Sequence, residues 1–227
     1  MKNEEVKKII LEKGTFTAEE NLRVYNTYFH NWVEYNDYIY KRFNINFDNK
    51  ILDIGSSYGH NLIHFNRQSI GIEANQSLIP FSRSLGLNIM ELNIEDALPA
   101  DEKFDLIWCT DFLVHLISPY KFLYDCRKIL KDNGRLVIQI PLMSILNTHR
   151  SACHFYAFNK KSLLYLLEMN GYKILKTSGC IRKMPKIFNV IFEPVLQIFG
   201  GNIWVLAEKK ETSFNFKKSF LPNWFNK

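Results

Sequence analysis

The chain has 227 residues, 47% of them apolar, which suits one compact α/β domain with short additions at its ends and excludes two full domains. Its net charge of +6 favours acidic partners such as phosphate, carboxylate or anionic lipid headgroups. The basic residues are spread along the chain without an arginine-rich helix, so nucleic-acid binding is not expected.

The first predicted element is a helical cover, which we assign to residues 1–48. Aromatic and apolar side chains recur at helical spacing between Leu22 and Phe43 and predict one helix with an aromatic-rich face. The residues on that face are Leu22, Tyr25, Phe29, Trp32, Tyr40 and Phe43.

From Lys50 onward, short β-branched runs alternate with amphipathic stretches, the pattern of a parallel sheet with crossover helices. The first five predicted strands are 51–54, 69–73, 88–92, 104–109 and 135–140. A helix over 160–170 and strands over 172–177 and 203–208 follow, and the last two strands are expected to pair antiparallel. We therefore assign residues 49–210 to one α/β domain with a mostly parallel sheet of about seven strands and helices on both faces.

Between the last two strands, apolar residues recur at steps of three and four over about residues 185–199 and predict an amphipathic helix. Glu193, Pro194 and a glycine pair interrupt this stretch, which excludes a transmembrane span. Its apolar face could pack on the core, form a homodimer contact or lie on a membrane surface. The final residues, 211–227, are typical of a basic-aromatic tail.

The cysteines and the amino terminus indicate a cytoplasmic protein. The four cysteines stand at wide spacings without a C-x-x-C pair, so neither a zinc site nor a disulfide framework is indicated. No group of histidines and carboxylates has ligand spacing, and no metal is expected. The opening residues MKNEEVKKII mix acids and bases where a signal peptide needs an apolar stretch.

The segment ILDIGSSYGH places Asp53, Gly55 and Gly59 directly after the first strand, where glycines let the backbone turn and approach a ligand. This spacing lacks the third glycine of a dinucleotide fingerprint, and no catalytic Tyr and Lys pairing is found, which disfavours a nicotinamide-dependent oxidoreductase. Twenty residues after Asp53, the second strand ends in Glu73, whose carboxylate can accept hydrogen bonds from both hydroxyls of a ribose.

This order of motifs resembles class I S-adenosylmethionine-dependent methyltransferases over about Lys50 to Lys209. The resemblance implies the Rossmann-like class I methyltransferase fold and S-adenosyl-L-methionine as cofactor. The segments that carry it are ILDIGSSYGH, SIGIEAN, ELNIEDALP, FDLIWCTDFLVHL, LKDNGRLVIQIP and HFYAFNKKSLLYLLEMNGYKILKT. Each motif is common by itself, but their fixed order favours this family.

The resemblance also implies a cofactor site, in which Asp53 binds the ammonium of the methionine portion and Glu73 binds the ribose. Asp53 has a second interpretation, in which it only caps the loop by accepting backbone hydrogen bonds. Asn93 stands where the family commonly has Asp, and its amide oxygen can accept from the adenine amino group. The predicted cofactor-binding residues are Asp53, Gly55, Ser57, Gly59, Glu73, Ala74, Asn93, Ile94 and Thr110.

An acceptor hydroxyl needs a base as its oxygen attacks the methyl group, and histidine is the usual one near neutral pH. We predict His115 and His154 as catalytic residues, with His149 also available. The resemblance favours O-methylation of a sugar of a surface polysaccharide or glycolipid, in the cytoplasm or at the inner face of the membrane, and hence polysaccharide biosynthesis. The alternatives are a C- or N-methyltransferase of a quinone, lipid or secondary metabolite, and a non-catalytic binding module.

Overall fold

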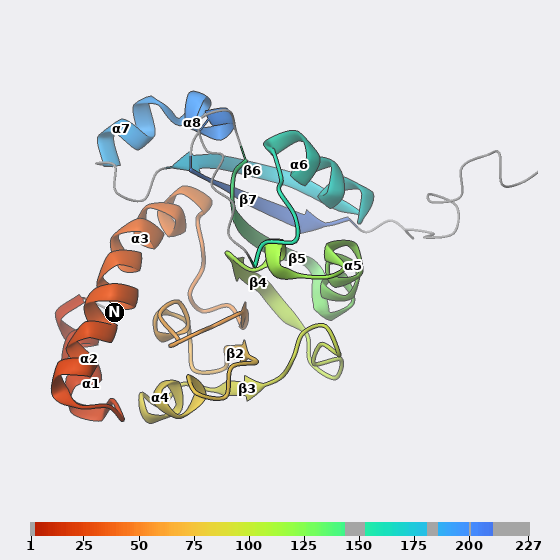
Figure 1. Ribbon diagram of the computed structural model, residues 1–227. Helices are drawn as coiled ribbons and strands as arrows, with labels where there is room; N and C mark the ends of the chain where they lie inside the picture. Colours follow the sequence, from red (N-terminus) through yellow and green to blue (C-terminus); the bar gives the residue numbers. More distant parts are fainter. Residues whose placement is uncertain (1–2, 144–152, 181–185, 200, 211–227) are drawn as a thin grey trace, which may run out of the picture.

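The computed structural model describes residues 3–143, 153–180, 186–199 and 201–210 (Figure 1). His149 and the predicted tail 211–227 lie outside these ranges. Seven strands form one sheet in the order β3-β2-β1-β4-β5-β7-β6. The strands are β1 (Ile51–Ile54), β2 (Ile70–Glu73), β3 (Ile89–Glu91), β4 (Phe104–Thr110), β5 (Leu130–Pro141), β6 (Tyr172–Cys180) and β7 (Asn202–Lys209).

Strands β1 to β5 pair in parallel, whereas β7 pairs antiparallel with both β5 and β6. The seven-stranded class I methyltransferase fold and the antiparallel last pair are thus confirmed. All four residues of β1 are buried, as expected for a parallel strand that is covered on both faces. The strand order reverses between β1 and β4, and open α/β sheets bind ligands at the carboxyl ends beside such a reversal.

Helices cover both faces of the sheet (Figure 1). Helices α5 and α6 pack on one face, and α3 and α4 pack on the other. The α-helices are α1 (Asn3–Lys13), α2 (Ala18–Val24), α3 (Asn31–Phe43), α4 (Ile79–Ser84), α5 (Pro119–Ile129), α6 (Lys160–Met169), α7 (Lys186–Ile191) and α8 (Glu193–Phe199). A π-helix, η1 (Tyr25–His30), and two 3-10 turns, η2 (Leu62–His64) and η3 (Leu113–His115), complete the elements.

The amino-terminal cover is helical, but the single helix predicted between Leu22 and Phe43 is divided by η1. A π-helix changes the angular position of the side chains that follow it, so a uniform helical spacing does not describe this segment. Accordingly Tyr25 and Phe29 are buried, while Leu22 is 38% exposed. The side chain of Trp32 lies outside the described residues.

The predicted helix over 185–199 forms two short helices, α7 and α8, that meet at Phe192. Pro194 stands in the first turn of α8, where its missing N–H would be unpaired in any case. The side chain of Arg42 at the end of α3 binds both carboxylate oxygens of Glu193, at 2.9 and 3.1 Å, and holds α8 in place. No helix in the described ranges is both long and apolar enough to cross a membrane.

Candidate functional site

The predicted cofactor-binding residues lie at or shortly after the carboxyl ends of β1, β2, β3 and β4. Ser57 in the glycine loop donates its backbone N–H to Oε2 of Glu73 at 2.8 Å, which joins the ends of β1 and β2. Thr110 ends β4, and its Oγ1 lies 3.5 Å from Nδ2 of Asn61. The structure therefore brings these separate motifs to one edge of the sheet.

The glycine loop requires glycine at both of its predicted positions. Gly55 and Gly59 adopt φ angles of 69° and 82°, which residues with a side chain rarely occupy. A Cβ atom at Gly55 would lie 2.7 Å from Cδ2 of Phe112, and one at Gly59 would collide with Leu87. The bare backbone of this loop can therefore lie close to a ligand, as the motif predicts.

Asp53 is a completely buried carboxylic acid at the centre of the site. The side chain of Asn61 and the backbone of Leu62 act on its carboxylate and lower its pKa, so Asp53 as a loop cap and Asp53 as a ligand for the ammonium both stay predictions. Burial, and then the negative charge of Glu73, raise the pKa of Asp53 well above its usual value. A buried carboxylate without an ionic partner is costly, and a bound ammonium would offset that cost, so Asp53 fits the charge of the expected cofactor.

Glu73 is half-buried, and backbone groups fix its orientation. Besides the bond from Ser57, its Oε1 accepts the N–H of Asn75 at 2.8 Å. Each carboxylate oxygen has a further lone pair, so both can also accept hydroxyl protons from a ribose. Ala74 directly follows and is exposed.

The predicted adenine-facing residues, Asn93 and Ile94, differ in their exposure. Asn93 is exposed, and its Oδ1 accepts the N–H of Glu95 at 3.1 Å within its own turn. Ile94 is buried and belongs to the apolar cluster on one face of the sheet. The amide oxygen of Asn93 keeps a second lone pair for a ligand, and Ile94 supplies an apolar wall beside it.

The two predicted catalytic histidines lie against each other although they come from different segments. His115 ends η3, directly after β4, and His154 lies in the segment between β5 and α6. Their ring centroids are 4.8 Å apart with an interplanar angle of 71°. Both side chains are half-buried, so each ring is supported by the protein and remains accessible.

A pair of buried asparagines beside Asp53 was not predicted. Nδ2 of Asn36 on α3 lies 2.5 Å from Oδ1 of Asn61, which directly follows the segment ILDIGSSYGH. Asn36 stands seven residues from both Phe29 and Phe43, so it interrupts an apolar helical face. A polar residue at such a position signals a buried hydrogen-bond partner, and this signal could have identified Asn36.

Gln139 on β5 is a second residue that the sequence analysis missed. It is completely buried, and its side chain both accepts the N–H of Asp111 at 3.0 Å and donates to Oδ1 of Asp111 at 2.9 Å. Asp111 has a φ of 52°, an uncommon conformation that these bonds stabilise. Gln139 therefore sets the direction of the chain as it leaves β4 towards His115.

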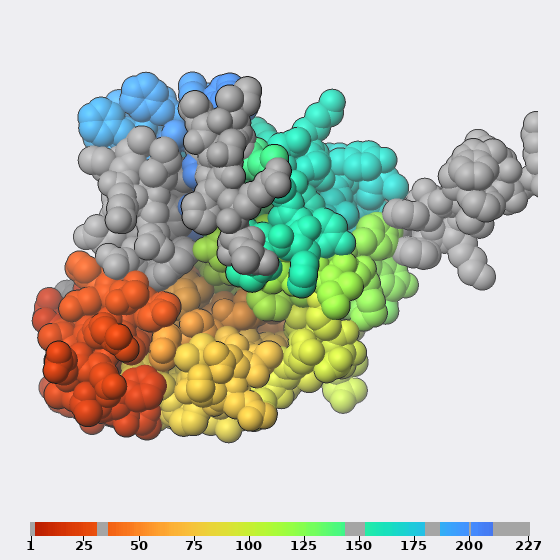
Figure 2. Space-filling view, in the orientation of Figure 1, coloured from red at the N-terminus to blue at the C-terminus, as the bar shows by residue number. Residues whose placement is uncertain are grey.

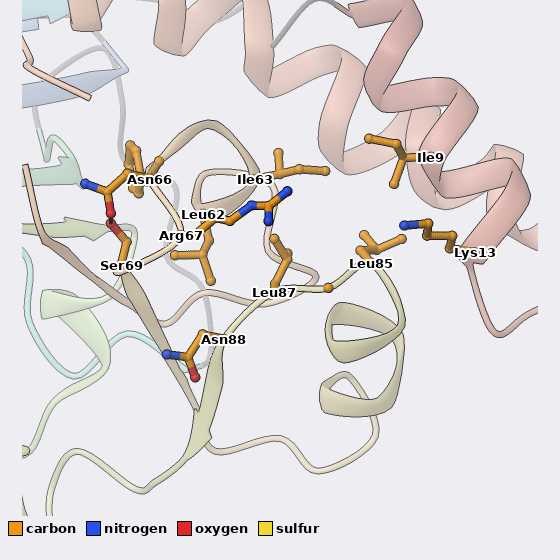
Figure 3. A pocket seen from close by; sticks show the side chains of 12 residues that line it. Ile9, Lys13, Leu62, Ile63, Asn66, Arg67, Ser69, Leu85, Leu87 and Asn88 are labelled. Atoms are coloured by element: carbon orange, nitrogen blue, oxygen red, sulfur yellow. Dashed lines mark hydrogen bonds between the residues drawn. The ribbon is translucent and has the colours of Figure 1, made fainter. Parts of the chain in front are cut away.

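A hollow of about 820 Å³ lies at the opposite edge of the sheet (Figure 3). Ser69 and Asn88, which line it, directly precede β2 and β3, so the hollow is at the amino ends of these strands. The side chains of Lys13 and Arg67 also line it. Because α/β sheets bind ligands at the carboxyl ends, we place the candidate site beside Asp53 and Glu73.

Comparisons with known proteins agree with this geometry. The sequence matches the model of a methyltransferase domain over residues 28–177. An uncharacterized protein of Methanocaldococcus jannaschii is 28% identical over 187 residues, which cover 80% of each chain. A ubiquinone biosynthesis O-methyltransferase of Glaesserella parasuis is 30% identical over 162 residues, which cover 64% of this chain and 66% of that protein. The crystal structure of a SAM-dependent methyltransferase from Archaeoglobus fulgidus has a TM-score of 0.58 at 20% identity, covering 78% of this chain and 94% of that one.

Proposed function

The chain belongs to the S-adenosylmethionine-dependent methyltransferase family, and on this premise we propose that it methylates a hydroxyl oxygen of a lipid-linked acceptor, with the sugar of a glycolipid as first candidate. The observation that carries the proposal is an exposed apolar surface at the same edge of the sheet as the cofactor motifs.

The cofactor is proposed to bind across the ends of β1, β2 and β4. Asp53 supplies a buried negative charge for the ammonium of the methionine portion, and Glu73 accepts hydrogen bonds from the ribose. Thr110, at the end of β4, borders the methyl group. The methyl carbon of a sulfonium is already electrophilic, so the protein mainly needs to align the acceptor and exclude water.

The acceptor is proposed to meet the cofactor beside His115 and His154. These rings lie beyond the end of β4, on the side that the chain reaches after Thr110 and Asp111. An imidazole there can take the proton of the attacking hydroxyl. The likeness to a ubiquinone biosynthesis O-methyltransferase supports oxygen as the methylated atom, and it makes a quinol hydroxyl the second acceptor class.

The apolar surface consists of the exposed residues of α7 and α8. Figure 2 shows these two helices, in blue, at the surface of the molecule. β6 runs parallel to β5, because both pair antiparallel with β7. The connection from β6 to β7, which contains α7 and α8, therefore leaves the sheet at the carboxyl ends. The exposed residues are Ile187, Phe188, Val190, Ile191, Phe192, Val195, Ile198 and Phe199.

The positive charges near α7 favour an anionic membrane as the partner of this surface. In the sequence, Arg182 and Lys183 closely precede α7 and Lys186 begins it, and the whole chain carries a net charge of +6. Apolar side chains next to lysines and arginines are the composition of helices that lie in the interface of a bilayer. Contact there would bring a membrane-embedded acceptor to the edge of the sheet that holds the site.

The test combines methyl transfer with vesicle binding. Transfer of labelled methyl from S-adenosylmethionine is measured to glycolipids, to quinols and to soluble nucleotide sugars, each with and without phosphatidylglycerol vesicles. We expect transfer to a lipid-linked hydroxyl, enhanced by the vesicles. Transfer only to soluble acceptors, or to none of the three classes, would overturn the proposal.

Vesicle binding is measured separately by sedimentation with phosphatidylglycerol or phosphatidylcholine vesicles. The double variant I191S/V195S should bind the anionic vesicles at least about tenfold more weakly, because each side chain contributes roughly 1–2 kcal/mol when it enters an apolar environment. Tyr165→Ser, which removes a side chain that is 64% exposed on α6, should bind like the parent protein. Equal losses in both variants would contradict a specific role for α7 and α8.

A further inference from the structure

Three side chains from two segments, none of them a predicted cofactor-binding residue, place metal-binding atoms close together. His115, Cys153 and His154 each offer one ligand atom, and these atoms all lie within 4.8 Å of one another. Cys153 is exposed and both histidines are half-buried, so a cation could enter from solvent. We propose that these three residues form a binding site for a thiophilic divalent cation, of which Zn²⁺ is the main candidate.

The chemistry of the three groups selects this class of cation. Two imidazoles and a thiolate suit Zn²⁺ and related transition metals, whereas Mg²⁺ and Ca²⁺ prefer oxygen ligands. Ligands on a tetrahedral Zn²⁺ are about 3.5 Å apart, given metal–ligand bonds of about 2.0–2.3 Å. The ligand atoms therefore need to approach one another by up to about 1.3 Å, which rotation about the side chains' own bonds can supply.

A hydrogen bond already orients one of the ligands. Nδ1 of His115 lies 2.9 Å from the carbonyl oxygen of Cys153, an acceptor, so Nδ1 carries the proton and Nε2 presents its lone pair. Histidines that bind metals commonly donate their other ring N–H to such a carbonyl, which fixes the ring orientation. The arrangement that supports a metal ligand is thus present at His115.

Two hydrogen bonds hold the segments together without involving the side chains of His115, Cys153 or His154. The N–H of Phe155 donates to the carbonyl oxygen of Val114 at 2.9 Å, and the hydroxyl of Tyr156 donates to that of Ile117 at 2.8 Å. Residues directly beside His115 and His154 are therefore fixed before any cation binds. A site on two tethered segments loses little conformational entropy on binding, which favours affinity.

Three protein ligands leave one position of a tetrahedral Zn²⁺ open, as in catalytic zinc sites. This extension rests on the proposed function, because the open position would then take the acceptor oxygen. A hydroxyl bound to Zn²⁺ loses its proton at a lower pH, so the cation would do the work otherwise assigned to a histidine base. No metal was expected from the sequence, because His115 stands far from Cys153 and His154 in the chain.

The test uses Co²⁺ as a spectroscopic substitute for Zn²⁺ on the metal-free full-length protein, without acceptor or S-adenosylmethionine. We expect one equivalent of Co²⁺ to give the absorption of a tetrahedral site together with a thiolate-to-cobalt charge-transfer band, and Zn²⁺ to displace it. Cys153→Ser should abolish the charge-transfer band. His115→Gln and His154→Gln should weaken Co²⁺ binding by more than the roughly 10- to 100-fold that loss of a hydrogen-bond partner behind a ligand costs.

His30→Gln serves as the matched control, because His30 is an exposed histidine on η1 in the amino-terminal cover. It should bind Co²⁺ like the parent protein. A charge-transfer band that survives in Cys153→Ser, or the absence of stoichiometric Co²⁺ binding in a folded parent protein, would overturn the inference. This readout needs no methyl acceptor, so failure of the metal site and failure of the proposed function are distinguished.

Discussion

The imidazole rings of His115 and His154 meet edge to face, with centroids 4.8 Å apart, although β5 lies between them in the chain. The contact depends on the fold, because β4 and β5 are parallel neighbours and their carboxyl ends release both segments at the same edge. Gln139 strengthens it by fixing Asp111, where the chain turns from β4 towards His115. The sequence names the two histidines separately, and the fold brings their rings side by side.

The first prediction concerns these histidines. His154→Gln and His115→Gln should each lower the rate of methyl transfer by about 100-fold or more, because each removes either the base or a ligand of the cation that would activate the hydroxyl, and a positioned acid–base group contributes roughly 10²–10⁴. Neither variant should change the dissociation constant for S-adenosylmethionine, since neither histidine is one of the predicted cofactor-binding residues. Turnover and calorimetric binding measured on the same preparations check this, and unchanged turnover in both variants would exclude histidine chemistry.

The second prediction compares two glycines with nearly equal backbone angles. Gly59 and Gly86 have φ values of 82° and 80°, but a Cβ atom would collide with Leu87 only at Gly59, and at Gly86 it would meet nothing within 4 Å. Gly86→Ala should therefore lower the free energy of unfolding by about 1–2 kcal/mol. Gly59→Ala should cost a further 1–3 kcal/mol, approximately, because the added methyl is overpacked.

Urea denaturation of both variants measures this difference. Only Gly59→Ala should also weaken binding of S-adenosylmethionine, because only Gly59 belongs to the loop that is proposed to face the cofactor. Equal unfolding free energies in the two variants would show that the collision at Gly59 is relieved without cost.

The sequence predicted the strands well because local pattern and final burial agree there. Ile51 to Ile54 are apolar apart from Asp53, and all are buried, so the run itself specifies a strand covered on both faces. The prediction of one continuous helix between Leu22 and Phe43 was wrong for a different reason. The π-helix at Tyr25–His30 changes the helical register, and a search for one constant spacing does not detect it.

For the site, the motifs at Asp53 and Glu73 were predictable because each directly follows a strand. Asn36 and Gln139 were not, because their roles depend on partners that the fold supplies, namely Asn61 and Asp111. The sequence also could not predict whether the apolar face of α7 and α8 is exposed. An amphipathic pattern gives an apolar face, but only the packing of the chain decides whether that face is covered.

The third prediction separates the two carboxylates by the part of the cofactor each would hold. Glu73→Gln should weaken binding of S-adenosylmethionine by about 10- to 100-fold, because hydrogen bonds to a charged group contribute roughly 1.5–3 kcal/mol. Glu73→Gln should also weaken the binding of methylthioadenosine by a similar factor, because this ligand keeps the ribose and lacks only the amino-acid portion. Calorimetry with both ligands checks this, and Glu102→Gln, at the carboxylate that pairs with Lys50, is the control.

The fourth prediction uses the raised pKa of Asp53. In the ligand-free protein, burial and Glu73 favour the protonated acid over a pH range that begins near the ordinary value of 3.8. In this pH range the folded state binds more protons than the unfolded state. The stability that Asp53 contributes is therefore fully present below about pH 3.8 and is lost as the pH rises through the raised pKa of Asp53. Asp53→Asn cannot ionise, and it should raise the melting temperature of the ligand-free protein at neutral pH.

Binding of the cofactor should have the opposite pH dependence. The ammonium of S-adenosylmethionine needs the carboxylate of Asp53, so its affinity should increase with pH until Asp53 is ionised, and binding below that point should release a proton. Methylthioadenosine lacks this ammonium and should not share the increase. In Asp53→Asn the pH dependence should disappear and the affinity for S-adenosylmethionine should fall by about 10- to 100-fold. Dissociation constants measured for both ligands across the pH series decide the matter, because identical slopes for the two ligands would mean that Asp53 does not bind the ammonium.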